Sequence, residues 1–275
     1  MAMAWALLRS THPGPSFAVA ALAAILSWGF GVGLIPAVLV VLSVLLNQFS
    51  VGLSNDAIDA PRDQEAKRSD KPVAAGDISR AGVWAWAIIF AMVSLTLAGL
   101  IHPGVLISQA VFLLAGWFYN LGLKSTVFSA LAYAVGFGAL PAIISYAAHP
   151  AAFPPWWSVV IAAGLGIAAH FGNVVPDRED DAAQGVRGLP QRLPARVAAG
   201  VLTGMIIVMA GVLVQGAGTQ AFPASLPSAA VAVMVAVAGG VWALSRPQSR
   251  WAFRASIVAS LVLAAGLTGS VLLAG

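Results

Sequence analysis

The chain has 275 residues, of which 60% are hydrophobic and only 9% are charged, and its mean hydropathy is +0.90. This composition excludes an ordinary soluble protein and predicts a polytopic membrane protein. The net charge of +4 suits basic loops that lie against anionic lipid, and nothing in the pattern indicates nucleic-acid binding. The lack of cysteine excludes a disulfide framework, a thiolate nucleophile and a zinc-thiolate site.

Apolar runs long enough to cross about 30 Å of hydrocarbon occur nine times. The first run is long and has no clear small-residue cleavage site, so we interpret it as a membrane span and not as a cleaved signal peptide. We therefore expect an all-α fold, with one integral-membrane domain over residues 1–275 built as a bundle of nine transmembrane helices. The expected spans are Ser16–Gly33, Ile35–Asn55, Gly82–Ile101, Val105–Gly122, Val127–Ala147, Trp156–Asn173, Val197–Gly216, Ser228–Leu244 and Phe253–Leu273.

The basic residues are distributed unevenly among the connections between these spans. All 14 Lys and Arg residues lie in alternate connections, beginning with Arg9 before the first span. By the positive-inside rule these connections are cytoplasmic, so we expect the N-terminus inside and the C-terminus outside. The excess of Arg over Lys and the abundance of Ala, Gly and Val are typical of a GC-rich bacterial source, which indicates the bacterial cytoplasmic membrane.

The ten acidic residues lie in only two of the basic connections, and each group forms a short motif. The first motif, NDAIDAPRD, follows the second span and places Asn55, Asp59 and Asp63 four residues apart. Residues at this spacing share a helical face, so one amide and two carboxylates should form a stripe, with Asp56 alongside. Pro61 lies inside the motif and is expected to kink or end the helix.

The second motif, NVVPDREDD, follows the sixth span and repeats the spacing with Asn173, Asp177 and Asp181. Carboxylate and carbonyl oxygens are ligands that Mg²⁺ accepts, and this ion commonly completes its shell with substrate phosphates. A charge at the bilayer centre is costly, so both motifs belong at the interface or in a wet cavity. We therefore expect one active site near the cytoplasmic face, in which Mg²⁺ bridges the two motifs to a diphosphate.

Basic residues near these motifs are candidate ligands for phosphate oxygens that the metal leaves uncovered. Arg68 and Lys71 follow the first motif in a loop of alternating charge, which is long enough to cover the mouth of the bundle. Lys124 is the one cation in its short cytoplasmic connection. The alternative interpretation of the loop from Arg62 to Arg80 is a solvated linker.

Three side chains near the same end are candidates for an acceptor pocket. Tyr119 belongs to an aromatic cluster that closes the fourth span, and Tyr133 lies in the fifth span. His170 precedes Asp177 by seven residues, which places both on nearly the same helical face. The alternative for Tyr119 is an interfacial aromatic belt, and the alternative for His170 is a hydrogen-bonded packing role.

At these residues the chain resembles the UbiA superfamily of intramembrane prenyltransferases. The family's first motif, NDxxDxxxD, is matched in full by the stretch from Asn55 to Asp63. Its second motif, DxxxD, is matched by Asp177 and Asp181, and GVRGLP follows as it commonly does in the family. The departures are Lys71 before a proline, where many relatives have arginine, and a missing proline just before Lys124.

The resemblance covers most of the chain and implies roles for the residues of both motifs. It implies Mg²⁺-mediated diphosphate binding by the acids, and contact with phosphate oxygens by Lys71, Lys124 and Arg187, to which Arg68 is added as a nearby cation. The candidate catalytic residues are Asp59, Asp63, Asp177 and Asp181. The candidate metal ligands are Asn55, Asp56, Asp59, Asp63, Asn173, Asp177 and Asp181.

The function implied is Mg²⁺-dependent transfer of an isoprenoid chain from a prenyl diphosphate to a small acceptor, with a quinone-precursor aromatic acid as the first expectation. Cations would stabilise the leaving diphosphate, and an apolar pocket would keep water from the carbocation. Three alternatives stay open: a cation-coupled membrane transporter, a noncatalytic relative that keeps the bundle, and a transferase that uses another lipid-linked diphosphate or phosphoribosyl donor.

Overall fold

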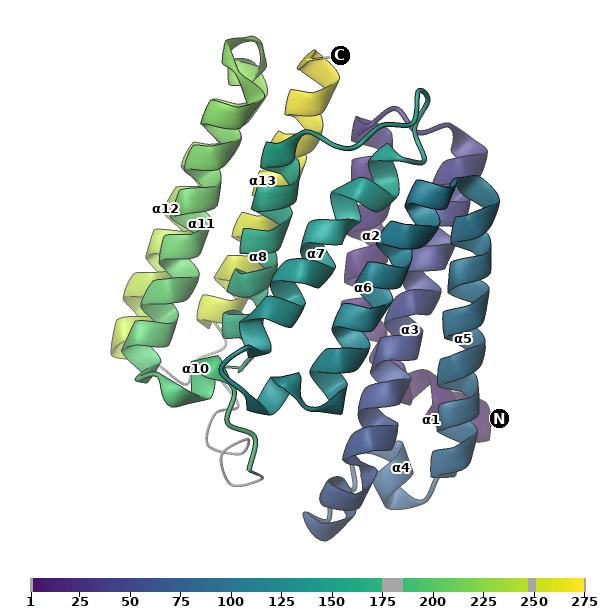
Figure 1. Cartoon of the computed structure of the whole chain (residues 1–275). Coiled ribbons are helices and arrows are strands. Elements are labelled where there is room, and N and C mark those ends of the chain that lie inside the picture. Colours follow the sequence, from purple (N-terminus) through teal and green to yellow (C-terminus); the bar gives the residue numbers. More distant parts are fainter. Residues whose placement is uncertain (1, 175–184, 247–250, 275) are drawn as a thin grey trace.

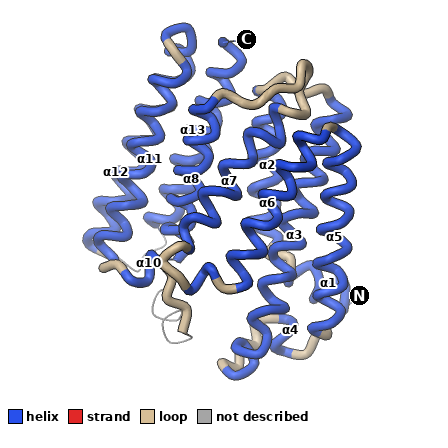
Figure 2. Tube along the Cα trace, in the orientation of Figure 1, coloured by secondary structure: helices blue, strands red, loops and turns tan. Residues whose placement is uncertain are grey.

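The computed structural model describes residues 2–174, 185–246 and 251–274, and all regular secondary structure in these ranges is helical (Figure 1, Figure 2). Two single-turn 3₁₀ helices, η1 (Leu123–Ser125) and η3 (Thr219–Ala221), lie in connections. The α-helices are α1 (Ala2–Ser10), α2 (Pro13–Gly29), α3 (Leu34–Glu65), α4 (Pro72–Ala75), α5 (Arg80–Ile101), α6 (Pro103–Leu121), α7 (Ser129–Ser145), α8 (Trp156–Val174), α10 (Leu189–Arg192), α11 (Ala195–Ala217), α12 (Phe222–Ser245) and α13 (Trp251–Ala274).

The long helices run side by side as a bundle, and their connections gather at two opposite ends (Figure 1). The short helices α1, α4 and α10 lie at one of these ends, which we call the charged end. Every Lys and Arg within the described ranges lies in or beside the connections at this end. The first helix, α1, lies at the charged end and the last helix, α13, finishes at the opposite end (Figure 1). The chain between them therefore crosses the bundle an odd number of times.

Seven of the described helices are long and apolar enough to cross a membrane: α3, α5, α6, α8, α11, α12 and α13. The other two expected spans coincide with α2 and α7, which have 17 residues each. Such a helix is about 25 Å long, short of a hydrocarbon core of roughly 30 Å. Helix α2 ends at Gly29, before the expected Gly33, because the chain turns at Gly31 with a φ of 65°. Seven long spans and two shorter apolar helices therefore stand in place of the expected nine.

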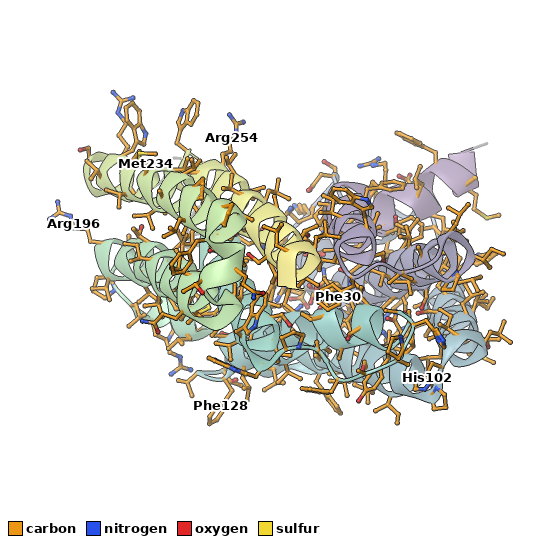
Figure 3. All side chains as sticks on the ribbon, turned by 90° about the horizontal axis from the view of Figure 1, so that it is seen from above. Phe30, His102, Phe128, Arg196, Met234 and Arg254 are labelled. Carbon is orange, nitrogen blue, oxygen red and sulfur yellow. The ribbon has the colours of Figure 1, made fainter. Side chains whose placement is uncertain are left out.

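Apolar side chains form two buried clusters. The larger one joins α2, α3, α5 to α8 and α11 to α13 along the bundle. The smaller one lies at the charged end, where Ala57 and Ala60 of α3 pack against Val73 of α4 and Val83 of α5. Other large apolar side chains face outward, as Met234 does in the end-on view (Figure 3). Apolar side chains around the whole bundle are what lipid, and not water, accommodates.

Helix α3 does not end at Pro61, contrary to the sequence-based expectation, but continues to Glu65. Proline has no N–H to donate to the carbonyl four residues earlier, which is that of Ala57. In this structure Arg80 Nε donates to the Ala57 oxygen at 2.7 Å. The missing backbone bond is thus replaced from α5, and Asp63 stays on a continuous helix with Asn55 and Asp59.

Candidate active site

Asn55 and Asp59 present their oxygens to the same point on one face of α3. Lys124 Nζ, from η1, donates to Asn55 Oδ1 at 3.2 Å and to both carboxylate oxygens of Asp59 at 2.5 and 2.7 Å. Arg62 Nη2 lies 3.1 Å from Asp59 Oδ2. Both Asp59 and Lys124 are 8% exposed, so this cluster of charges is largely shielded from solvent. Burial lowers the pKa of Lys124, and the Asp59 carboxylate opposes that change.

Asp56 points away from this stripe, because adjacent residues on a helix do not share a face. Its carboxylate, only 2% exposed, accepts hydrogen bonds from Lys71 Nζ at 2.8 Å and from His12 Nε2 at 2.9 Å. His12 has a left-handed backbone with a φ of 51° and precedes the first residue of α2. Sequence analysis missed His12. Its one local signal was a histidine directly before Pro13, where a helix can begin.

Asp63 differs from the other acids of the first motif in its hydrogen bonding. It is 3% exposed, and no described side chain donates a hydrogen bond to its carboxylate, although the cations Arg62 and Lys71 act on it electrostatically. Its backbone oxygen accepts from the amide of Arg68 at 2.9 Å, which closes the end of α3. A buried carboxylate without a hydrogen-bond donor is a site that an additional cation would satisfy.

Two of the predicted diphosphate ligands lie apart from the acids of α3. The guanidinium group of Arg68 donates two bonds of 2.8 Å to Asp70 and, as the main cause, lowers the pKa of that carboxyl to about 2. Arg9 of α1 donates to the Asp70 backbone oxygen at 2.6 Å and ties α1 to this loop. The side chain of Arg187 is exposed, and its backbone oxygen accepts from Arg192 Nε at 2.8 Å.

The connection that carries Lys124 is held by the segment that follows the second motif. Gly188 passes so close that a Cβ atom at this position would collide with the Lys124 backbone oxygen. The amide of Leu189 donates to Ser129 Oγ at 2.9 Å, and the same hydroxyl lies 2.9 Å from His170 Nε2. Ser129, the first residue of α7, therefore joins α7 to α8 and to the GVRGLP segment.

The three predicted pocket residues lie together between α6, α7 and α8. The rings of Tyr133 and His170 stack with centroids 4.7 Å apart, and the Tyr119 ring meets both edge-on at 5.1 and 5.6 Å. The Tyr133 hydroxyl also interacts with the side chains of Tyr119 and Asn173. His170 is fully buried, and its Nδ1 has no hydrogen-bond partner in the described part of the chain.

A cavity of about 490 Å³ extends from this aromatic group between α2, α7, α8 and α13. Gly14, Asn173 and Ser256 line it near the charged end, while Leu26 and Leu267 line it deeper in the bundle. From Gly14 to Leu26 the wall follows about 18 Å of helix. Almost all of its lining is apolar. A smaller cavity of about 100 Å³ lies on the other side of Tyr133 and is lined by Gln48 and Tyr119 among others.

Asp177 and Asp181 of the second motif lie outside the described ranges, and of its predicted metal ligands only Asn173 is placed. Within the described ranges, no group of three or more His, Asp or Glu side chains is arranged to hold a metal ion.

Comparison with known proteins identifies the class. The sequence profile of the UbiA prenyltransferase family matches residues 3–267, so the chain belongs to this family of intramembrane prenyltransferases. Together with the apolar helices, this makes it an integral membrane protein. A comparison with curated proteins found no match.

Solved structures of UbiA homologues have the same fold. A UbiA homologue of Archaeoglobus fulgidus bound to DMAPP and Mg²⁺ is 19% identical, with a TM-score of 0.74 and coverage of 97% of this chain and 98% of that one. The apo form of a UbiA homologue of Aeropyrum pernix K1 is 16% identical, with a TM-score of 0.75 and coverage of 92% and 97%. A structure described for digeranylgeranylglyceryl phosphate synthase is 17% identical, with a TM-score of 0.68 and coverage of 100% and 99%.

Proposed function

We propose that this protein transfers an isoprenoid chain from a prenyl diphosphate to a small acceptor, in a Mg²⁺-dependent reaction within one intramembrane domain. The observation that carries the proposal is the combination of buried acids and cations at the charged end with a long apolar cavity that opens beside them. A charged diphosphate head and an oily tail are the two substrate parts that such a site accommodates. The structural neighbour bound to DMAPP and Mg²⁺ has the same fold.

The oxygens of the first motif fit Mg²⁺. Asn55 Oδ1 and both oxygens of Asp59 converge on the Lys124 ammonium group, so they already stabilise one cation at a shared point. These are the hard oxygen ligands that Mg²⁺ prefers, and when bound the ion would neutralise charge on the leaving diphosphate. The other proposed ligands are Asp56, Asp63, Asn173, Asp177 and Asp181.

The chain's own cations would bind the diphosphate oxygens. Ion pairs hold Lys124 beside Asp59 and Lys71 beside Asp56. If Mg²⁺ took these carboxylate oxygens, the two ammonium groups would be released to the phosphate oxygens nearby. Arg68 and Arg187 lie nearer the surface and would attract the negatively charged donor towards the site. We assign catalysis to Asp59, Asp63, Asp177 and Asp181, which would hold the Mg²⁺ that neutralises charge on the leaving diphosphate.

The large cavity would hold the prenyl tail and exclude water. The cavity follows about 18 Å of helix from Gly14 to Leu26, which is long enough for an extended chain of a few isoprene units. We therefore propose a donor close to farnesyl diphosphate in length. Since the lining is apolar, an allylic carbocation formed there would meet the acceptor before it met water.

The acceptor would bind beside Tyr119, Tyr133 and His170. The 100 Å³ cavity next to Tyr133 is of the order of size of cavities that hold a benzene ring. Aromatic walls favour a flat acceptor, which supports a quinone-precursor-like compound. His170 Nδ1, buried without a hydrogen-bond partner in the described ranges, is a candidate to take the acceptor's proton.

The positive-inside distribution of Lys and Arg supports a charged end that faces the cytoplasm, with the N-terminus inside and the C-terminus outside a bacterial cytoplasmic membrane. This places the acids where soluble Mg²⁺, a prenyl diphosphate and a small acceptor are all available.

The test is a transfer assay with detergent-purified protein and labelled dimethylallyl, geranyl, farnesyl and geranylgeranyl diphosphates, each with and without Mg²⁺ and a panel of aromatic acceptors. We expect Mg²⁺-dependent diphosphate release and a prenylated acceptor, with farnesyl diphosphate the preferred donor. Turnover with a phosphoribosyl or other lipid-linked donor in place of prenyl diphosphates would contradict the proposal. Mg²⁺-independent behaviour with every donor, combined with cation flux into proteoliposomes, would favour the transporter.

A further inference from the structure

Pro61 removes one backbone hydrogen bond from α3 within the first motif. The carbonyl that loses its helical partner belongs to Ala57, and the proline itself lies between Asp59 and Asp63. Ala57 is completely buried in the small apolar cluster at the charged end. A buried carbonyl without a partner costs free energy, so the continuity of α3 past Pro61 needs a compensating donor.

Arg80 supplies that donor from another helix. Its Nε donates to the Ala57 oxygen at 2.7 Å, which is a short, charge-assisted bond. Arg80 is the first residue of α5, and Ser79 fixes this helix start because its hydroxyl accepts from the Gly82 amide at 3.1 Å. The start of α5, which carries Arg80, is therefore fixed by this cap.

The position of Arg80 has no local explanation on α5. A cation is unfavourable at a helix N-terminus, where the macrodipole is positive. The bond to the Ala57 carbonyl explains why an arginine is placed there. Val83 and Ala87, on the following turns of α5, are buried in the same cluster as Ala57 and Ala60 of α3, so the two helices are packed together around this bond.

We propose that Arg80 is a positioning residue for the acidic motif: it replaces the hydrogen bond that Pro61 removes, and so keeps the last turns of α3 helical and Asp63 aligned with Asp59. Its consequence for turnover rests on the proposed function, but its consequence for α3 does not. The proposal also predicts that the effect of replacing Arg80 depends on residue 61, because the Arg80 bond is needed only while residue 61 is proline.

A double-mutant cycle tests this dependence. The four proteins are the natural chain, Arg80→Ala, Pro61→Ala and the double variant, and the readout is amide hydrogen exchange of residues 58–65 in detergent. We expect Arg80→Ala to accelerate exchange of this segment at least tenfold. In the Pro61→Ala background, where an amide at residue 61 can bond Ala57, the same substitution should change exchange less than twofold.

Two further variants guard the result. Arg196, in the first turn of α11, points away from the bundle (Figure 3), so Arg196→Ala is a matched loss of a helix-start arginine and should leave residues 58–65 unchanged. Arg80→Lys retains a donor and should restore part of the protection, even where Arg80→Ala is poorly folded. Equal acceleration by Arg80→Ala in both backgrounds, or no acceleration in either, would overturn the proposal.

Prenyl transfer is measured on the same four proteins. We expect Arg80→Ala to raise the Mg²⁺ concentration needed for half-maximal turnover, and Pro61→Ala to suppress that effect. An exchange cycle with the expected pattern in a protein that transfers no prenyl group would contradict the proposed function and leave the role of Arg80 in place.

Discussion

Two regions of the helix bundle are packed in different ways. Where α3 meets α5 and α6, the contact is solid and polar: Ser43 and Ser94 each donate to the other's backbone oxygen at 2.9 and 2.8 Å, and Gln109 Nε2 donates to both residues. Between α2, α7, α8 and α13, the bundle is instead hollow and apolar, and it encloses the cavity of about 490 Å³.

The polar side continues towards the acids. Ser43, Asn47, Ser50 and Ser54 form one stripe on α3, and all four are fully buried. Ser50 donates to Ala87 of α5, while from α6 the Trp117 indole donates to Ser50 and Asn120 donates to Ser54. Small and polar residues of this kind allow close helix packing in lipid, where apolar surface alone gives no preference for another helix. The polar contacts of α3 with α5 and α6 therefore fix the helix that carries the acidic motif. The cavity between α2, α7, α8 and α13 leaves room for an apolar chain.

The largest effect is expected from Asp59→Asn, which removes one charge from the anchored motif. The amide cannot pair with Lys124 or hold Mg²⁺ as a carboxylate does, so prenyl transfer should fall about 100-fold or more. Glu65→Gln, on the exposed surface of the same helix, is the matched control and should retain activity. Gel filtration checks that both variants stay folded. Full turnover by Asp59→Asn would remove the metal-site proposal.

Next in size is the effect of filling the hollow side. Ala264 of α13 lines the cavity, so Ala264→Phe should lower kcat/KM for farnesyl diphosphate about tenfold, the equivalent of about 1.4 kcal/mol, and should spare dimethylallyl diphosphate. Val258→Phe places the same phenylalanine side chain on the exposed face of α13 and should change neither rate. An equal loss of kcat/KM with both donors would show that the cavity does not select donors by the length of the prenyl tail.

A smaller effect should follow from disrupting the polar contacts between α3, α5 and α6. Gln109→Leu removes two buried donations and should cost about 1 kcal/mol of stability, with little change in kcat. Thermal unfolding in detergent measures the difference. Thr96→Val on α5 removes a bond to its own helix at an exposed position, and its unfolding temperature should stay close to that of the natural chain. Greater loss for Thr96→Val than for Gln109→Leu would contradict the anchoring role.

The smallest effect concerns the exposed Arg68–Asp70 pair. Because Arg68 lowers the folded-state pKa of Asp70 to about 2, its stabilisation is present above the usual Asp value near 3.8 and is lost as pH falls towards 2. With Asp70 60% exposed, solvent screening limits the loss in Asp70→Asn at pH 6 to about 0.5 kcal/mol or less. Unfolding free energies at pH 6 and pH 3 check the sign. A larger difference at pH 3 would contradict it.

The sequence predicted the helices well because long apolar runs need no tertiary information to be recognised. The periodicity of the first motif also places Asn55 and Asp59 together, as their common contact with Lys124 demonstrates. Lys124 could be selected in advance because it is the one cation in its short connection.

The remaining features depend on contacts between distant residues. His12 reaches Asp56 across 44 positions, and nothing around His12 in the sequence indicates that partner. Helix α3 continues past Pro61 beside the bond from Arg80 to the Ala57 oxygen, and nothing around Pro61 in the sequence indicates that contact across 23 positions. The short α2 and α7 were overestimated because apolar residues extend into the turns beyond their ends.

The central claim is that the acids of α3, through a bound metal ion, hold a diphosphate, while the cavity between α2, α7, α8 and α13 holds its prenyl tail. The most direct measurement is a crystal structure with a non-reactive farnesyl thiodiphosphate and Mn²⁺, whose anomalous signal locates the metal. We predict Mn²⁺ between Asn55, Asp59 and the second motif, with the farnesyl chain between α2, α7, α8 and α13. Metal bound elsewhere, or a chain lying outside that cavity, would contradict the account.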